Sequence, residues 1–235
     1  MVSLTSTFMK NSISIRLPSI FAALLPGLLV GVSSSTASGK DYDMPELNAA
    51  LSLSSIWVPV SQALVQVYND DMIRRRPQTR TRFVAGFTHG APNDGTDTGS
   101  DYVWIQKTPM PDPPFTPEQF ATMLPRVTSK NKSQFEGLLK DKVASIDPGI
   151  AHYEARLNAV IYDSSPTLPD GSSGRMRAFL IMTKKCLISI NAYSTPASAD
   201  AVFEEVRGVV STLNIKEDQK MPPTWIGRLQ AILTQ

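Results

Sequence analysis

The sequence predicts an α+β fold, a mostly antiparallel β-sheet flanked by helices in an α/β/α sandwich. The strand-like segments follow one another in runs, without the regular strand–helix alternation of a parallel sheet. The long helical segments carry apolar residues at the spacing of one helical face. The 235 residues are 42% hydrophobic and 19% charged, which suits a globular protein that buries a core.

The first 37 residues have the order of a secretory signal peptide. Lys10 and Arg16 come first, with no acid, and an apolar run of about 16 residues extends from Leu17 to Val32 before small residues that end at Ala37. We predict cleavage after Ala37, within a few residues. An uncleaved membrane anchor is the alternative, although the run is shorter than the roughly 20 residues of a membrane span.

The rest of the chain divides into three parts. We expect a polar lead-in at 38–47, a single α+β domain at 48–215 and a tail at 216–235 with a short amphipathic helix. The long polar loops at 89–101 and 163–174 interrupt the domain, and the sequence leaves open whether they form a site. Cys186 lies in a strand-like segment, so we expect a buried thiol.

The first half of the domain predicts a strand, a helix and a hairpin. The strand runs over 50–58 and the helix over 61–75, where an arginine run and Pro77 end it. The apolar positions of this helix share one face: Ala63, Leu64, Val67, Tyr68 and Met72. Residues 82–87 and 102–106 are rich in β-branched and aromatic residues, which favours two hairpin strands.

The second half predicts helices, then strands, then helices. Thr116 caps a helix that has Pro117 in its first turn. The remaining elements are a helix over 132–144, strands over about 150–162, 174–184 and 186–194, and a helix over 197–212. We expect the helices at 61–75, 132–144 and 197–212 to cover the sheet.

Three parts of this pattern resemble the PsbP-like and DcrB-like exported domains. They are the strand from Leu51 that ends at Trp57, the hairpin strand Phe83-Val-Ala-Gly-Phe87, and the closing unit in which a strand over 187–193 leads through Ser194-Thr195-Pro196 into the helix that contains 203–210. The resemblance covers about residues 48–215. It implies a non-enzymatic accessory or binding domain outside the cytoplasm, with no shared catalytic residues to carry over.

Residues Asp97-Thr98-Gly99-Ser100 spell the motif that pepsin-like proteases place around a catalytic aspartate. Such enzymes need two carboxylates that share one proton, and each follows a buried strand. Here a polar stretch precedes Asp97 and no second Asp-Thr/Ser-Gly follows. We therefore predict a hairpin loop. A dimeric aspartic hydrolase that takes Asp97 from each copy is the alternative.

Other chemistry has weaker support. Asp94, Asp97 and Asp101 could gather around calcium, but their spacing does not fit an EF-hand loop, so we predict no metal and no cofactor. The arginine run at 74–76, with Arg80 and Arg82, suits either an anion site or a solvated helix end, and we favour the helix end.

The tail helix carries the strongest signal for a partner. Its apolar residues could pack on the domain itself, or dock a protein or a membrane surface: Trp225, Ile226, Leu229, Ile232 and Leu233. The whole chain has a net charge of +2, and removal of the first 37 residues brings it near zero. A neutral domain is a poor candidate for nucleic acid.

Together these observations predict an exported accessory or binding protein, periplasmic or secreted, that is not an enzyme and has a protein partner. The alternatives are the dimeric hydrolase and a membrane-associated protein held by an uncleaved N-terminus or by the tail helix.

Overall fold

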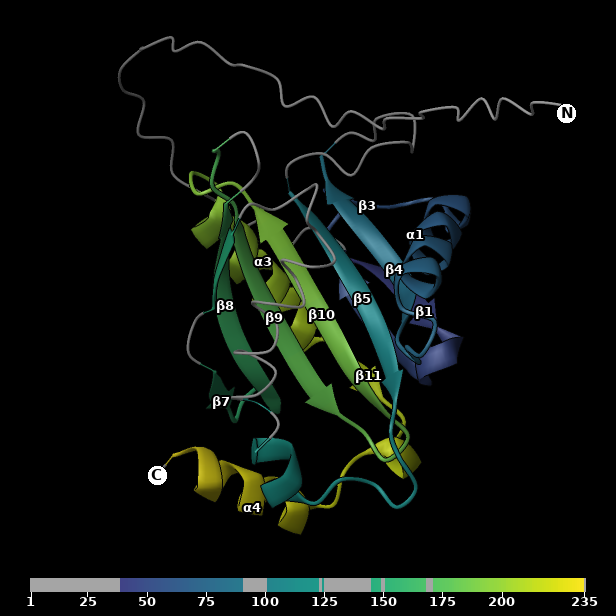
Figure 1. Cartoon of the computed structure of the whole chain (residues 1–235), viewed down its shortest axis with the longest axis vertical. Helices are drawn as coiled ribbons and strands as arrows, with labels where there is room; N and C mark the ends of the chain where they lie inside the picture. Colours follow the sequence, from purple (N-terminus) through teal and green to yellow (C-terminus); the bar gives the residue numbers. More distant parts are fainter. Residues whose placement is uncertain are drawn as a thin grey trace, which may run out of the picture. The chain divides into compact units, whose positions relative to one another are not determined.

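Two antiparallel β-sheets form the framework of the computed structural model, which describes residues 39–90, 101–122, 124, 145–148, 151–167 and 171–234 (Figure 1). The large sheet has eight strands in the order β3-β4-β5-β10-β9-β8-β6, with β7 paired to β8, and the small sheet has the order β1-β2-β11. The strands are β1 (Lys40–Met44), β2 (Ala49–Leu53), β3 (Trp57–Pro59), β4 (Arg82–His89), β5 (Tyr102–Pro109), β6 (Ser145–Pro148), β7 (His152–Glu154), β8 (Ala159–Thr167), β9 (Arg175–Met182), β10 (Cys186–Ser194) and β11 (Asn214–Ile215).

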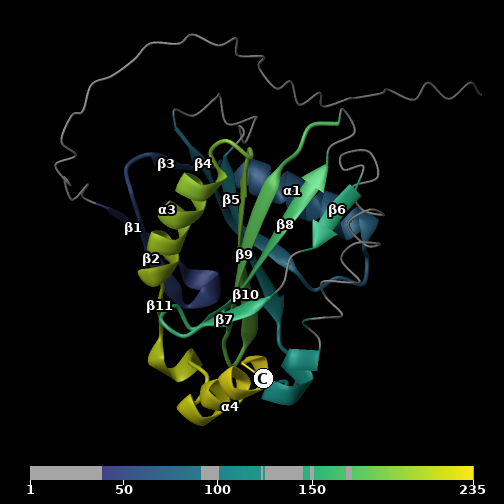
Figure 2. The same cartoon turned by 90° about the vertical axis from the view of Figure 1, so that its left-hand side faces the viewer.

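Helices cover both faces of the large sheet, as the predicted sandwich requires. α3 (Ala199–Ser211) lies on one face with the small sheet, and α1 (Gln62–Arg75) lies on the other beside β4 (Figure 2). α4 (Pro223–Leu233) and a helix that begins at Pro117 lie together at one end of the sheet (Figure 1). The described residues also form two short 3-10 helices: η1 (Pro45–Leu47) and η2 (Glu217–Gln219).

The core follows the alternation of side chains along the strands. In β10, Ile188 and Ile190 face α3 and the small sheet, whereas Leu187 and Tyr193 face the opposite side. The α3 face holds the largest apolar cluster, and α3 adds Val202, Phe203, Val206 and Val210 to it. The second face holds two smaller clusters, one under α1 and one under α4.

The strand expected over 50–58 is two strands that belong to different sheets. β2 ends at Leu53 in the small sheet, and β3 begins at Trp57 and pairs with β4 in the large sheet. The break is a turn at Ser54–Ile56, where the backbone N–H of Trp57 donates to the carbonyl of Ser54 at 3.1 Å. This turn carries the chain from one sheet to the other, so Leu53 and Trp57 reach the same core from two directions.

Two further expectations differ from the structure. The polar lead-in contains β1 and η1, where Met44 and Leu47 are buried because β1 pairs with β2 at the edge of the small sheet. The strand expected over 150–162 is divided into β7 and β8 by a turn at 155–158, in which Asn158 takes a left-handed conformation with φ 49°.

The predicted helix over 61–75 is confirmed, but its apolar face is only partly correct. Val65 and Asn69 are the buried residues of α1, whereas Val67 is 53% exposed. Asn69 replaces an apolar contact with two hydrogen bonds, because its Oδ1 accepts from the N–H of Phe83 at 2.7 Å and its Nδ2 donates to the Phe83 carbonyl at 3.0 Å. A polar side chain therefore ties α1 to β4.

The hairpin, the strands of β9 and β10, and the helices of α3 and α4 are confirmed. Thr116 caps the helix at Pro117, since its Oγ1 accepts from the N–H of Gln119 at 3.2 Å. The helix predicted over 132–144 lies outside the described residues. Within the described ranges, no helix is both long enough and apolar enough to cross a membrane.

Candidate functional site

The apolar residues of the tail helix pack against their own domain. Leu229 is 2% exposed, and Trp225, Ile226, Ile232 and Leu233 are half-buried against the cluster of the second sheet face. The indole Nε1 of Trp225 donates to the carbonyl of Phe115 at 3.0 Å. The tail helix therefore packs on its own domain, which is one of the roles that the sequence left open. Four of these side chains are partly exposed, so binding of a partner stays a prediction.

The Asp-Thr-Gly-Ser stretch, with Asp94 and Asp97, lies outside the described residues. Asp101, which follows it, has a structural role. Its Oδ1 accepts from the hydroxyls of Ser194 at 2.6 Å and Ser198 at 3.0 Å, which joins the end of β10 to the start of α3. Among the residues that the structure describes, no group of three His, Cys, Asp or Glu side chains could hold a metal ion.

The arginine run closes α1. Arg74 and Arg75 both pair with Asp71, one turn earlier on the same helix, and Arg82 donates to the carbonyls of Thr79 and Thr81. Burial of Asp71 opposes ionisation, but hydrogen bonds from the two arginines outweigh it and lower the pKa of that carboxyl. These contacts fit the solvated helix end favoured by the sequence. Cys186 is buried at 3% exposure, as expected.

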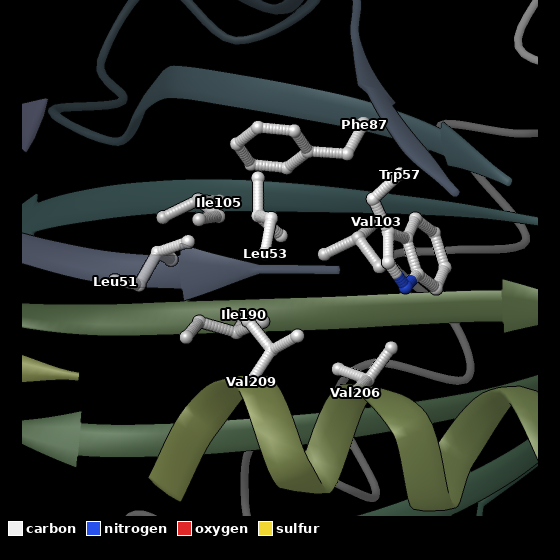
Figure 3. A pocket seen from close by; sticks show the side chains of 9 residues that line it. All are labelled: Leu51, Leu53, Trp57, Phe87, Val103, Ile105, Ile190, Val206 and Val209. Atoms are coloured by element: carbon white, nitrogen blue, oxygen red, sulfur yellow. The ribbon is translucent and has the colours of Figure 1, made fainter. Parts of the chain in front are cut away.

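A cavity lies inside the core where α3, β2 and the large sheet meet (Figure 3). Its volume is about 10 Å³, enough for roughly one water-sized group. We call it the Trp57 cavity. Every residue that lines it is apolar: Leu51, Leu53, Trp57, Phe87, Val103, Ile105, Ile190, Val206 and Val209.

The local structure explains how these side chains converge. Leu51 and Leu53 are two residues apart on β2, and Val103 and Ile105 are two apart on β5, so each pair shares one face of its strand. Val206 and Val209 are three apart on α3 and point toward the strands (Figure 3). Val209 is the half-buried member of the lining, so the cavity comes nearest to the surface between α3 and β2.

The helix above the cavity is held at both ends. Near its start, Ser198 donates to Asp101, and at its end the Oγ1 of Thr212 accepts from the N–H of Ser52 at 2.9 Å. Arg207 on the outer side of α3 also pairs with Glu154, with Nε donating to Oε1 at 3.1 Å. Because α3 is fixed at these points, it cannot move closer to the sheet and close the cavity.

Trp57 lines the cavity with the apolar part of its ring, and its one polar atom is buried outside the cavity surface. It is 4% exposed, and its indole Nε1 is buried without a hydrogen-bond partner. Figure 3 shows this nitrogen on the side of the ring that faces Val206 and α3. Buried N–H donors are normally satisfied, so this nitrogen is an exception, although it contributes no surface to the cavity.

His89 and Glu205 lie beside Trp57. His89 is the cross-strand neighbour of Trp57, and the two rings meet edge to face with centroids 5.1 Å apart. The Nε2 of His89 is 3.3 Å from Oε2 of Glu205 on α3, but both atoms are buried without hydrogen-bond geometry. The side chains are 30% and 39% exposed, so the pair stands between the indole and solvent. The sequence suggested only an exposed loop position for His89.

Sequence reasoning did not identify this site. Trp57 attracted notice as the end of a strand, and the valines of α3 as a helical stripe, but about 150 residues separate them. The period-two apolar pairs at 51/53 and 103/105 predict buried faces, yet no local pattern shows that the packed faces leave a space. The unpartnered indole is a property of the assembled core alone.

No family model matches the chain, and no curated protein matches it. The structure is similar to cyanobacterial PsbP (CyanoP) from Synechocystis sp. PCC 6803, with 14% identity, a TM-score of 0.47, and coverage of 80% of this chain and 98% of that one. It is also similar to LpqN of Mycobacterium tuberculosis, a protein involved in cell envelope biogenesis, with 12% identity, a TM-score of 0.38, and coverage of 71% and 82%.

Proposed function

We propose that this chain is a non-enzymatic binding protein that works after export and holds a small apolar ligand in the Trp57 cavity. The observation that carries the proposal is the unfilled space in an otherwise buried apolar cluster, lined by apolar side chains. Protein interiors pack as densely as organic crystals, and an unfilled space lowers stability. A space of this kind suits an apolar occupant.

The position of Val209 supports a route for the ligand. It is half-buried, while the other eight lining residues are buried, so a ligand would enter between α3 and β2. The cavity as it stands takes about one water-sized group. The ligand therefore has to be small, about the size of a methyl group.

Xenon, a small apolar probe, tests this proposal on the full chain by NMR. We expect methyl resonances of Leu53, Val206 and Val209 to shift with increasing xenon. Val206→Ile adds one carbon to the cavity wall and should abolish the shifts. Val210→Ile makes the same change one turn further along α3, at a buried residue that does not line the cavity. This variant should leave binding intact. Shifts that persist in Val206→Ile would refute the site.

Export remains part of the proposal. Its support is the basic, apolar and small-residue order of residues 1–37, which end three residues before β1 begins at Lys40. When the chain is expressed with its own N-terminus in a bacterial host, we expect the periplasmic fraction to contain a form that lacks about the first 37 residues, by intact mass. An uncleaved chain confined to the membrane fraction would contradict export and favour the anchor.

A protein partner at α4 is a second candidate function. The half-buried Trp225, Ile226, Ile232 and Leu233 support it, because they leave apolar surface in reach of a partner. We expect Leu233→Lys to lose a partner that the wild-type chain recovers from its host, while Gln230→Lys, on an exposed position of the same helix, retains it. Equal recovery by both variants would remove α4 from the interface.

A further inference from the structure

β1 is the outer strand of the small sheet, and it differs from the other edge strands that the structure describes (Figure 2). β3, β6 and β11 have three, four and two residues, and β3 and β6 each end in a proline, which has no N–H for a further strand. β1 has five residues and no proline. Short strands and prolines protect a sheet edge, so β1 is the described edge least protected in this way.

The register of the small sheet shows which backbone groups of β1 point outward. Asp41 lies opposite Ser52 on β2, and the N–H of Ser52 donates to Oγ1 of Thr212 at 2.9 Å, on the side of β2 away from β1. Asp43 lies opposite Ala50, which pairs with β11 on that same side. In an antiparallel pair, positions that bond across the pair alternate with positions that do not. The N–H and C=O groups of Asp41 and Asp43 therefore point away from β2, and no described residue is hydrogen-bonded to them.

Elsewhere in the described fold, side chains take the place of a missing strand. Asn69 bonds both the N–H and the carbonyl of Phe83 on β4, at 2.7 and 3.0 Å. Thr212 serves the N–H of Ser52 on β2 in the same way. Since no described side chain does this for β1, its two N–H and two C=O groups are available to an extended segment of another protein.

The side chains of β1 determine what such a segment should carry. Successive side chains of a strand alternate between its faces, so Asp41 and Asp43 share one face and Tyr42 lies on the other. Both aspartates are exposed, and Oδ1 of Asp41 accepts from Oγ of Ser52 at 2.6 Å. Tyr42 is half-buried and meets Phe87 edge to face, with ring centroids 4.9 Å apart. The edge thus combines two carboxylates on one face with an aromatic ring on the other.

A second copy of the chain does not fit this edge. Two β1 strands paired antiparallel about Tyr42 would place Asp41 of each copy opposite Asp43 of the other. Like charges directly opposite each other destabilise a pair of strands, whereas opposite charges at the same positions stabilise it. A strand with cations opposite the two aspartates therefore suits the edge better than another β1 does.

From this geometry we infer that the outer edge of β1 binds an extended basic segment of a partner protein by β-strand addition. The segment pairs antiparallel with β1 and carries lysine or arginine opposite Asp41 and Asp43. An apolar residue between these two cations lies beside Tyr42, so the recognised pattern is basic, apolar, basic. This surface is separate from the Trp57 cavity and from α4, so the inference does not depend on either proposal above.

A capped synthetic peptide, Thr-Val-Lys-Val-Lys-Val-Thr, tests the inference on the full chain by NMR. We expect the amide protons of Asp41 and Asp43 to move downfield and to gain protection from hydrogen exchange. Those of Tyr42 and Met44, which point toward β2, should change little. A peptide with glutamate in place of both lysines should not bind. A peptide with methyl groups on the backbone nitrogens of both lysines keeps its charge but loses two donors, and should bind roughly ten-fold more weakly.

Asp43→Asn removes one of the two carboxylates and should weaken binding by roughly two- to five-fold, the range of an exposed ion pair. Asp70→Asn is the matched control, because it makes the same change of charge at an exposed position on α1, and it should leave binding unchanged. Equally tight binding of the methylated peptide would mean attraction by charge alone and would overturn strand addition. The inference is also wrong if the parent peptide leaves both amides unmoved. Protection of these amides in the chain alone would contradict it as well, because another strand would then already occupy the edge.

Discussion

Trp57 and Trp104 lie on opposite faces of the large sheet and are packed very differently. A Cβ placed on Gly86 would come within 2.4 Å of the Trp104 ring and 2.7 Å of Val60, so the face under α1 has no room for one more carbon. On the α3 face, Trp57 borders a cavity of about 10 Å³. The sheet is therefore closely packed around Gly86 on one face and underfilled beside Trp57 on the other.

The difference shows that the space beside Trp57 is local. Trp104 is enclosed by aromatic rings, with centroids of Tyr68 and Phe83 at 4.7 and 5.1 Å. Trp57 instead lies where three elements meet, and its neighbours on α3 are valines, whose short side chains do not reach across the gap. A general shortage of packing would have affected both faces.

The largest effect should come from adding a carbon to the filled face. Gly86→Ala forces the new methyl group into the Trp104 ring, and we expect the free energy of unfolding to fall by about 3 kcal/mol, the upper range for overpacking. Denaturant unfolding measures this change. A loss below about 0.5 kcal/mol would show that α1 and Trp104 can move aside, and the contrast between the faces would be weaker than we infer.

Tyrosines on the filled face should make stability fall at high pH. Burial raises the pKa of Tyr162 to about 12, and burial together with Tyr102, Tyr162 and Tyr68 raises that of Tyr193. Because a raised tyrosine pKa means that folding disfavours the phenolate, this contribution is complete below pH 10, the unfolded value, and is lost as pH rises toward 12. Two pKa units correspond to roughly 3 kcal/mol, of which we expect on the order of 2 kcal/mol after relaxation.

Denaturant unfolding of wild type and Tyr162→Phe at pH 9 and near pH 12 measures the contribution of Tyr162 ionisation to stability. The difference between the two pH values should be smaller in Tyr162→Phe, which has no hydroxyl to ionise at this position. An equal pH dependence in both proteins would show that Tyr162 ionises in the folded chain as freely as in the unfolded chain.

Adding a carbon to the underfilled face should change the free energy of unfolding in the opposite direction to Gly86→Ala. Val206→Ile places one methyl group in the Trp57 cavity, and we expect the free energy of unfolding to stay equal or to rise by about 0.5 to 1 kcal/mol, as for other cavity-filling changes. Val210→Ile, at a buried position away from the cavity, should be destabilising instead. A destabilised Val206→Ile would mean that the space cannot take even a methyl group.

The smallest effect concerns α1, the helix that covers Trp104. Asp71 pairs with Arg74 and Arg75 at a partly exposed position, so Asp71→Asn should cost about 0.3 to 0.5 kcal/mol at neutral pH. The lowered pKa of Asp71 means that this contribution is present above its unfolded value near 3.8 and disappears as pH falls through the folded value. Wild type and Asp71→Asn should therefore converge in acid.

Asp70→Asn is the control for this change, because Asp70 is the neighbouring carboxylate on α1 and accepts from Gln66. Its unfolding free energy should differ from that of wild type by the same amount at neutral and acidic pH. A gap for Asp71→Asn that persists in acid would show that the carboxyl acts through packing or hydrogen bonding and not through its charge.

Local patterns predicted the elements of the fold well where the cause is local. Pro77 and the arginines fix the end of α1, Thr116 and Pro117 fix the start of a helix, and the alternation along β4, β5, β9 and β10 fixes their buried faces. The break between β2 and β3 was missed, because Ser54–Ile56 becomes a turn only when Leu53 and Trp57 are drawn to different sheets.

The candidate site could not be predicted from the sequence, for the same reason. The sequence around Trp57 predicts a strand but not what surrounds its indole. Val206 belongs to the same apolar helical face whether or not a cavity lies between α3 and the sheet. The unpartnered Nε1 of Trp57 and the close approach of Trp104 to Gly86 both depend on contacts between distant segments.

The most direct measurement compares wild type and Val206→Ile in the same buffer, by denaturant unfolding and by the shift of the Val209 methyl resonances with xenon. We expect Val206→Ile to unfold with an equal or higher free energy and to lose the shift, because the added methyl group occupies the ligand's place. A variant that is less stable and still shows the full shift would contradict both the underfilled core and the ligand site within it.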